Sequence, residues 1–272
     1  MKIIVCIKQV PSGEVKINPE TGTLIREGVQ SILNPFCEYA LDEAIRIKKE
    51  QEEGRRGKVE VIVLTMGPPQ ARSALLRCLE LGADRAILLC DRKFAGADTL
   101  ATSLALSEAI QKFEKDFVLV FTGKQAIDGD TAQVGPELAE HLGIPQITYA
   151  TSTTLIPERK RIQVKRETEN GYDIVECKLP ALISVSTGSN IRRILSFTEI
   201  INARKKAIKT VTADELSKET EKFGLSGSPT QVAKVFPPKS RTGGQKIESD
   251  DPEVAVDRLI VFLQENGFVE KE

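Results

Sequence analysis

The sequence predicts an α/β fold with a doubly wound, mostly parallel sheet. Short apolar runs typical of strands alternate with segments whose apolar residues recur at helical spacing, and the connections between them are short. Hydrophobic residues make up 40% of the 272 residues, which is enough for a sizeable core. The low aromatic content and the absence of Trp indicate an aliphatic interior.

The strands of the sheet are expected at residues 3–7, 59–66, 85–90, 117–122, 146–151 and 182–185. Helices are expected at residues 36–52, 68–81, 98–114 and 131–141, the second ended by Gly82 and the third begun by Asp98 or Thr99. Residues 8–31, rich in Pro and Gly, predict a long loop or hairpin. The loops after residues 7, 66, 90 and 122 then converge at the carboxyl ends of the strands, where such sheets bind ligands.

Residues 161–169 and 173–178 flank Asn170-Gly171, the strongest short hairpin signal. We expect this hairpin at an edge of the sheet. From residue 188 the chain becomes polar and basic, ending in an amphipathic helix at 254–268. We therefore expect one α/β domain over residues 1–187 and, over 188–272, an extended arm that packs on another protein. The basic residues of this arm form either a docking surface or a solvated face.

Charge and cysteine usage exclude several classes of protein. The 38 basic and 39 acidic residues give a net charge of −1, so no broad attraction to nucleic acid is expected. The five cysteines are widely separated, odd in number and without a CxxC pair, which disfavours a disulfide framework and a zinc or iron–sulfur site. The first apolar run is too short for a signal peptide or a membrane span. We therefore expect a cytoplasmic protein with reduced thiols, no membrane span and no metal site.

The most distinctive stretch follows the strand at 117–122 and is Gly123-Lys124-Gln125-Ala126-Ile127-Asp128-Gly129-Asp130-Thr131-Ala132-Gln133-Val134-Gly135-Pro136. A strand, a glycine-containing loop and a helix start leave backbone N–H groups free to hold an anion, which indicates a nucleotide-phosphate cradle. Asp130 is expected to cap the helix, with Gln133 closing a capping box, and Asp128 to accept a hydrogen bond from a ribose hydroxyl. Because the loop is neither GxGxxG nor a P-loop, an ordinary strand-to-helix turn is the alternative.

Several other motifs lie in register with this loop. They are Ile7-Lys8-Gln9-Val10, Asn34-Pro35-Phe36-Cys37, Gly82-Ala83-Asp84, and a Val-x-Arg-x-x-Glu…Leu-Pro-Ala signature at Val164, Arg166, Glu169, Leu179, Pro180 and Ala181. With them the chain resembles the β subunit of electron transfer flavoproteins over essentially its full length. Asn170 stands where Gly or an acid is more usual, a departure without obvious consequence. The resemblance implies a Rossmann-like, adenine-nucleotide-binding fold and a heterodimer with an α subunit, which carries a flavin and exchanges electrons with a dehydrogenase.

The resemblance also implies the residues of a cofactor site. They are Cys6, Asn34, Pro35, Phe36, Cys37, Met66, Gly123, Lys124, Gln125, Ala126, Ile127, Asp128, Gly129, Asp130, Thr131, Ala132, Gln133 and Val134. Housekeeping relatives hold AMP there, whereas electron-bifurcating relatives hold FAD that accepts hydride from NADH. Residues 128–136 and the run Phe94-x-Gly96-Ala97-Asp98-Thr99 resemble the bifurcating form, which adds Asp98 and Thr99 to the expected site. Gly129 and Ala132 have little bulk and would leave room for a pyrophosphate.

In the bifurcating form, one electron passes to a ferredoxin or flavodoxin and the other passes through the α-subunit flavin to an acyl-CoA or hydroxy-acid dehydrogenase or reductase. No residue of this chain is then expected to act as acid, base or nucleophile, because the cofactor carries the chemistry. His141, the only histidine, is expected to cap a helix end. Alignment of the basic run at 203–206 implies a contact with the dehydrogenase through Phe197, Arg204, Lys205 and Lys206.

Three alternatives stay open. One is the non-bifurcating, AMP-binding form of the same subunit. A second is a universal-stress-type ATP-binding regulator, which shares this kind of sheet but would lack the tail after residue 188. A nicotinamide dehydrogenase is the third, disfavoured by the missing GxGxxG motif and the missing acid and base residues.

Overall fold

The computed structural model describes residues 1–12, 16–17, 24–25, 31–187, 195–233 and 244–270 of the chain. The chain divides into two compact units, Met1–Val235 and Phe236–Glu272. The first unit contains the sheets and the second contains helix α7 (Pro252–Glu265).

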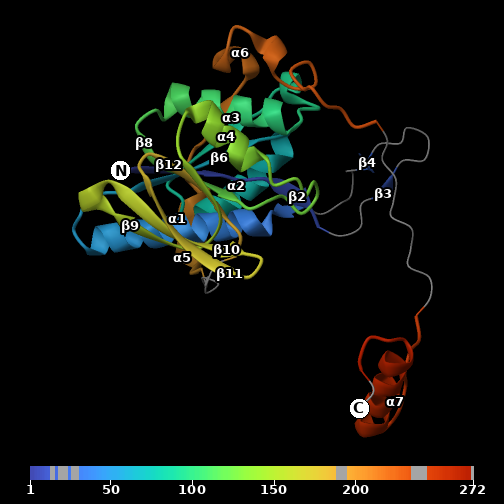
Figure 1. Cartoon of the computed structure of the whole chain (residues 1–272). Coiled ribbons are helices and arrows are strands. Elements are labelled where there is room, and N and C mark those ends of the chain that lie inside the picture. The colour runs from blue at the N-terminus through green and yellow to red at the C-terminus, as the bar shows by residue number, and fades with distance from the viewer. Residues whose placement is uncertain (13–15, 18–23, 26–30, 188–194, 234–243, 271–272) are drawn as a thin grey trace. The chain divides into compact units, whose positions relative to one another are not determined.

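The centre of the first unit is a nine-stranded sheet with the order β11-β10-β9-β12-β8-β1-β6-β7-β13 (Figure 1). All neighbouring pairs from β9 to β13 are parallel, while β9, β10 and β11 pair antiparallel. The predicted doubly wound, mostly parallel sheet with a hairpin at its edge is therefore confirmed. The strands are β1 (Lys2–Cys6), β6 (Glu60–Met66), β7 (Arg85–Leu89), β8 (Phe117–Gly123), β9 (Gln146–Ile156), β10 (Arg161–Thr168), β11 (Gly171–Lys178), β12 (Ala181–Val185) and β13 (Ile208–Val211).

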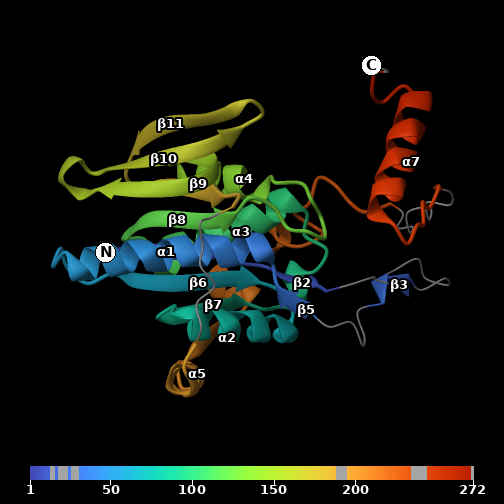
Figure 2. The same ribbon diagram turned by 90° about the horizontal axis from the view of Figure 1, so that it is seen from below.

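Helices cover both faces of this sheet (Figures 1 and 2). One face carries α1 (Pro35–Glu53) and α2 (Arg72–Leu81), with α5 (Phe197–Arg204) packed against α2. The opposite face carries α3 (Thr99–Phe113), α4 (Val134–Leu142) and α6 (Ala213–Leu216).

Alternate residues of a central strand enter the two cores. In β1, Ile3 and Val5 pack with α1 and α2, whereas Ile4 and Cys6 pack with α3 and α4. Since both faces are buried, the central strands need continuous apolar runs, and these runs are what made them recognisable in the sequence.

The Pro- and Gly-rich N-terminal region forms short antiparallel pairs. β2 (Gln9–Pro11) pairs with β5 (Ser31–Leu33), and β3 (Lys16–Ile17) pairs with β4 (Leu24–Ile25). The hairpin alternative for residues 8–31 is confirmed for the part of this segment that the structure describes.

Some elements differ from the prediction. Strand β13, in the polar segment after residue 188, was not predicted, yet it pairs with β7 and extends the sheet. The helix expected at 68–81 is divided into a 3-10 turn at Pro69–Ala71 and α2. Gly82, with φ of 124°, ends α2 as expected.

The proposed boundary at residues 187 and 188 stays a prediction, while β13, α5 and α6 belong to the first compact unit.

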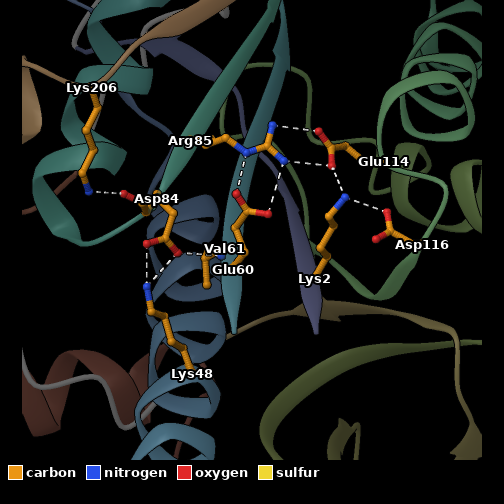
Figure 3. Close-up of polar contacts among 10 residues, drawn as sticks. Lys2, Lys48, Glu60, Val61, Asp84, Arg85, Glu114, Asp116 and Lys206 are labelled. Atoms are coloured by element: carbon orange, nitrogen blue, oxygen red, sulfur yellow. Dashed lines mark hydrogen bonds and ion pairs between the residues drawn. The ribbon is translucent and has the colours of Figure 1, made fainter. Parts of the chain in front are cut away.

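A network of charged side chains lies at the amino ends of the parallel strands (Figure 3). Arg85 at the start of β7 contacts Glu60 at 2.6 Å and Glu114 at 2.8 Å, and Lys2 contacts Glu114 at 3.1 Å and Asp116 at 2.7 Å. The guanidinium of Arg85 holds the pKa of the Glu60 carboxyl below its usual range. Ion pairs thus connect the starts of β1, β6 and β7 with the segment before β8 at this edge of the sheet.

Helix α7 of the second unit starts at an N-cap, Asp251, whose side chain accepts a hydrogen bond from the Glu253 backbone at 2.9 Å. This confirms the predicted C-terminal helix. Among the helices that the structure describes, none combines the length and the apolar character needed to cross a membrane.

Candidate nucleotide-binding site

The carboxyl edge of the sheet has a topological switch point at β1. The chain runs from β1 outward through β6 and β7, and then returns to place β8 on the other side of β1. Loops leaving two strands at such a point separate in opposite directions, and ligands of open α/β sheets bind between them. Lys8 follows β1 and Asp128 follows β8, and their side chains form an ion pair of 2.8 Å across this point.

Asn34 organises the loop after β8. The residue is fully buried at the N-cap of α1, but its side chain makes no cap hydrogen bond. Instead its amide donates to the Gln125 carbonyl at 2.8 Å and accepts from the Ile127 N–H at 3.2 Å. A buried amide without such partners would destabilise the fold, so these bonds fix the loop against the start of α1.

Glycine at position 123 is required by close packing. A Cβ there would lie 2.7 Å from the Phe36 carbonyl carbon and 2.9 Å from the Cys37 nitrogen. Gly135 in α4 is similarly close to β8, because a Cβ on it would lie 2.9 Å from Thr122 Oγ1. That hydroxyl is buried and finds no hydrogen-bond partner among the described residues.

The start of the following helix differs from the prediction. Asp130 and Ala132 both have positive φ, 55° and 56°, so neither belongs to a right-handed helix. Helix α4 begins only at Val134, with Gln133 as an N-cap that makes no side-chain cap bond. The expectation that Asp130 caps this helix, with Gln133 completing a capping box, is therefore wrong. The Asp130 carboxylate instead accepts a hydrogen bond from the Gln125 side chain.

The observed backbone is nevertheless suited to an anion. Ala132, with left-handed φ, precedes Gln133, which has right-handed φ and ψ of −92° and −33°. This alternation turns successive N–H groups toward the same side and forms the concavity that binds anions in many proteins. The N–H groups of residues 131–133 find no hydrogen-bond partner within the described part of the chain. Residues 127–131 are exposed, so a ligand could reach them.

Gly129 does not have a positive φ and faces open space, with nothing within 4 Å of where its Cβ would lie. The left-handed conformations belong to Asp130 and Ala132 instead. Any role for Gly129 therefore depends on the space left by its missing side chain and not on a backbone conformation that only glycine adopts easily.

Three more of the predicted residues provide packing at this edge. Cys6 and Cys37 are buried, and burial raises the pKa of both thiols, so they contribute apolar walls and no charge. Met66 ends β6 at the same edge and is partly buried.

Asp98 and Thr99 connect the start of α3 to other segments. Asp98 caps α3 by accepting from the Ala101 N–H at 3.0 Å, and it also accepts from the Thr230 N–H at 3.1 Å and hydroxyl at 2.8 Å. Partial burial opposes ionisation, but these hydrogen bonds hold the pKa of the Asp98 carboxyl below its usual range. The Thr99 hydroxyl lies 3.3 Å from Gln133 and 3.1 Å from Glu137, which ties α3 to the loop and to α4. Binding of a cofactor by either residue stays a prediction.

The charges of the loop leave a single cation unpaired. Asp128 pairs with Lys8 and Asp130 bonds to Gln125, whereas no described residue forms an ion pair with Lys124. The Lys124 ammonium instead lies 4.9 Å from the centre of the Tyr149 ring. Tyr149 was not among the predicted site residues, because its proximity depends on strand register and leaves no motif in the sequence.

The residues expected to contact a dehydrogenase lie elsewhere, on α5 and the turn after it. Phe197 is 78% exposed at the start of α5, which is capped by a Ser196–Glu199 capping box. The guanidinium of Arg204 lies 3.9 Å from Glu80. Lys206 points inward and donates to the Ala83 carbonyl at 2.6 Å, and burial lowers the pKa of its ammonium (Figure 3). A role in docking stays a prediction for all four residues, Phe197, Arg204, Lys205 and Lys206.

His141 lies in the last turn of α4, and its Nε2 is buried without a hydrogen-bond partner among the described residues. The helix ends at Gly143, which has a left-handed φ of 64°. His141 was expected to cap this helix end, and its Nε2 does not do so.

Comparison with known proteins identifies relatives along almost the whole chain. Residues 21–216 match the model of the electron transfer flavoprotein domain. An electron transfer flavoprotein subunit beta of Thermoanaerobacterium thermosaccharolyticum is 49% identical over 265 residues, 97% of this chain and 98% of its own length. The same subunit of Clostridium acetobutylicum is 45% identical over 270 residues, 99% of this chain and 100% of its own length.

A third relative carries a more specific name. The caffeyl-CoA reductase-Etf complex subunit CarD of Acetobacterium woodii is 44% identical over 270 residues, 99% of this chain and 100% of its own length. Identity at this level over whole chains, together with the domain match, leads to one assignment: this chain belongs to the electron transfer flavoprotein β-subunit family.

Proposed function

We propose that the chain is the β subunit of an electron-bifurcating electron transfer flavoprotein and that residues 123–134 bind FAD. The observation that carries the proposal is the loop between β8 and α4. Its N–H groups at 131–133 lie next to two left-handed residues and have no hydrogen-bond partner in the described part of the chain, and open space adjoins Gly129. A diphosphate requires both donors and room, whereas AMP needs only one phosphate position. The relative from Acetobacterium woodii, a subunit of a caffeyl-CoA reductase-Etf complex, also supports it.

The residues of this chain then hold and orient the cofactor. The N–H groups of residues 131–133 would donate to phosphate oxygens, and Lys124 would add a positive charge. Asn34 keeps the loop fixed, so the donors are in place before binding. When bound, FAD would supply the redox chemistry, taking two electrons from NADH and passing one toward a ferredoxin or flavodoxin and one toward the flavin of an α subunit.

Three kinds of partner follow from the proposal. One is an electron transfer flavoprotein α subunit, and a second is an acyl-CoA or hydroxy-acid dehydrogenase or reductase. The third is a ferredoxin or flavodoxin. Exposed Phe197, with the neighbouring cations Arg204 and Lys205, suits contact with the dehydrogenase, because an exposed aromatic residue beside charges is typical of an interface hot spot. A cytoplasmic location would suit electron exchange with these soluble carriers.

The flavin content of the purified αβ pair tests the proposal. We expect two FAD per pair and rapid reduction by NADH. One FAD together with one AMP, and no reduction by NADH, would contradict bifurcation and support the AMP-binding alternative.

A pair of variants at Gly129 tests the role of the loop. Gly129→Glu places a bulky carboxylate in the open space, so we expect loss of the β-subunit FAD while the fold is kept, since the residue is exposed. Gly129→Ala is the matched control and should retain both flavins, because its Cβ meets nothing within 4 Å. Retention of both flavins by Gly129→Glu would show that the diphosphate does not bind next to Gly129.

A further inference from the structure

Strand β9 contains a bulge next to the proposed site. Between its pairs with β12, β9 advances from Ile147 to Ala150 while β12 advances from Ile183 to Val185, so β9 carries one extra residue. Its pairing with β10 shifts at the same place, between Lys165 and Arg166. Bulges of this kind redirect a side chain and are frequent beside active sites.

Tyr149 lies in this bulge with φ of 58°. A large side chain at a left-handed φ is a genuine outlier, and such strain persists only where surrounding contacts fix it. Here Arg166 donates to the Thr148 carbonyl at 3.2 Å and to its hydroxyl at 3.3 Å, and the Tyr149 N–H donates to Ser184 Oγ at 3.3 Å. Arg166 is the arginine of the Val-x-Arg-x-x-Glu signature, so one role of that signature is to hold the bulge.

The strained residue faces the proposed nucleotide loop. Its ring centre lies 4.9 Å from the ammonium of Lys124, within the range of a cation–π contact. The Lys124 backbone is also fixed, because its N–H donates to the Val185 carbonyl at 2.7 Å. Lys124 follows Gly123 directly at the carboxyl end of β8, and its charge has no ion-pair partner among the described residues.

We propose that Tyr149 is a positioning residue: the β9 bulge, held by Arg166, directs its ring toward Lys124 and keeps that ammonium in place for the phosphates of the bound nucleotide. This inference rests on the proposed nucleotide site. Without the ring, Lys124 would sample many rotamers and contribute less to binding. The backbone strain at Tyr149 is then retained because it sets the direction of the ring.

A double-mutant cycle in the αβ pair tests the role of Tyr149. The readout is the dissociation constant of FAD released from the β subunit on dilution, followed by flavin fluorescence, with the α-subunit flavin as internal reference. Lys124→Met should weaken binding about tenfold, and Tyr149→Leu about threefold to tenfold. The double variant should bind FAD no more weakly than Lys124→Met alone. Tyr149→Phe keeps a π face and should restore wild-type binding.

Two controls separate this role from a structural one. Tyr172→Leu removes a comparable contact, in which Lys165 lies 3.9 Å from the Tyr172 ring on the edge hairpin, and it should leave the dissociation constant unchanged. Tyr149→Gly relieves the positive φ, so we expect a higher melting temperature together with weaker binding. If Tyr149 had only a structural role, Tyr149→Gly would change the melting temperature and the affinity for FAD in the same direction.

The outcomes also distinguish this inference from the proposed function. If the wild-type pair contains AMP in place of the second FAD, the same cycle is measured by calorimetry with AMP. Additive effects of Lys124→Met and Tyr149→Leu on either nucleotide would overturn the role of Tyr149 alone. A wild-type pair that binds neither nucleotide at the β subunit would overturn the proposed site, and this inference with it.

Discussion

At the scale of single residues, the candidate site depends on Gly123, where a missing side chain permits close contact. The backbone of Phe36 and Cys37 occupies the space that a Cβ would need. We predict that Gly123→Ala separates β8 from the start of α1 and destabilises the protein by about 1–3 kcal/mol, the usual range for overpacking. Thermal unfolding should show a melting temperature lower by several degrees, and the same variant should lose bound nucleotide.

Gly129→Ala provides the comparison in the same loop. It has open space and no positive φ, so its melting temperature should match that of the wild type. Equal melting temperatures for the wild type, Gly123→Ala and Gly129→Ala would show that α1 can move away from β8 without loss of stability.

Residue-scale rules predicted part of the site and failed at the loop itself. Asp98 was correctly expected at the start of α3, because a capping side chain needs only the local N–H groups of its own helix. Asp130 fits the same sequence pattern of a helix cap, but it does not cap α4. Its positive φ accompanies long-range contacts of the loop, namely Asn34 with Gln125 and Ile127, and Lys8 with Asp128. These contacts join residues about ninety or more positions apart in the sequence. No local sequence pattern could therefore predict them.

At the scale of elements, Asp98 joins α3 to the segment at 228–230. Its carboxylate caps the helix and accepts two hydrogen bonds from Thr230, while its own N–H donates to Ser228 Oγ at 2.8 Å. We predict that Asp98→Ala costs about 1–2 kcal/mol near neutral pH, the typical value of a lost cap. Chemical denaturation of the purified protein would measure this difference.

The pH dependence of the Asp98 effect has a definite sign. The pKa of this carboxyl is lower in the folded protein than its usual value of about 3.9, so its stabilising effect is present above that value. It is lost as the pH falls through the lower pKa of the folded state. The gap between wild type and Asp98→Ala should therefore narrow in acid. Ser228→Ala keeps the carboxylate and its bonds to Ala101 and Thr230, so it should show a smaller loss.

Helix α5 presents the next prediction. Phe197 is largely exposed, so Phe197→Ala should leave the melting temperature unchanged. If it contacts the dehydrogenase as proposed, the variant should slow electron transfer to that partner, with a loss of about 2 kcal/mol or more in affinity. Steady-state kinetics at varied dehydrogenase concentration would measure this, with NADH-driven flavin reduction as control. An unchanged rate of electron transfer to the dehydrogenase would show that Phe197 is not part of the interface.

The elements of the sheet were predictable to different degrees. Central strands such as β6 are buried on both faces and appear as continuous apolar runs. Edge strand β13 has only four residues, of which Val211 alone is buried, and it lies in a charged stretch, so the sequence shows no recognisable strand pattern. The extension of β9 beyond residue 151 was also missed: buried and exposed positions alternate there, but one of the buried residues is Thr153, so the sequence shows no apolar alternation.

At the scale of the whole molecule, the sequence predicted the doubly wound sheet because the order of strands and helices constrains the topology. It could not show that the segment around β13 and α6 completes the sheet unit, since that depends on burial of a few apolar residues such as Val211, Leu216 and Phe223. Ion pairs around Arg85 lie at the amino edge of the sheet, whereas the loop that we propose to bind the nucleotide lies at the carboxyl edge.

The second compact unit carries the last prediction. No residue of α7 is buried, and its exposed apolar side chains are Val254, Val256, Leu259, Ile260 and Val261. A helix with this many exposed apolar side chains is typical of an interaction site. Since the proposed function requires an α subunit, we predict that α7 binds it. Without that subunit, limited proteolysis should cleave the chain within Phe236–Glu272 and leave the unit Met1–Val235 intact.

Adding the α subunit should protect these sites, as mass spectrometry of the fragments would show. Leu259→Asp introduces a charge into the apolar surface and should abolish the protection. Asp257→Asn, a change of an exposed polar residue on the same helix, should preserve it. Cleavage at equal rates with and without the α subunit would show that α7 binds a different partner. Because Leu259 is exposed and lies outside Met1–Val235, neither variant should change the melting temperature of the sheet unit, which separates loss of docking from loss of fold.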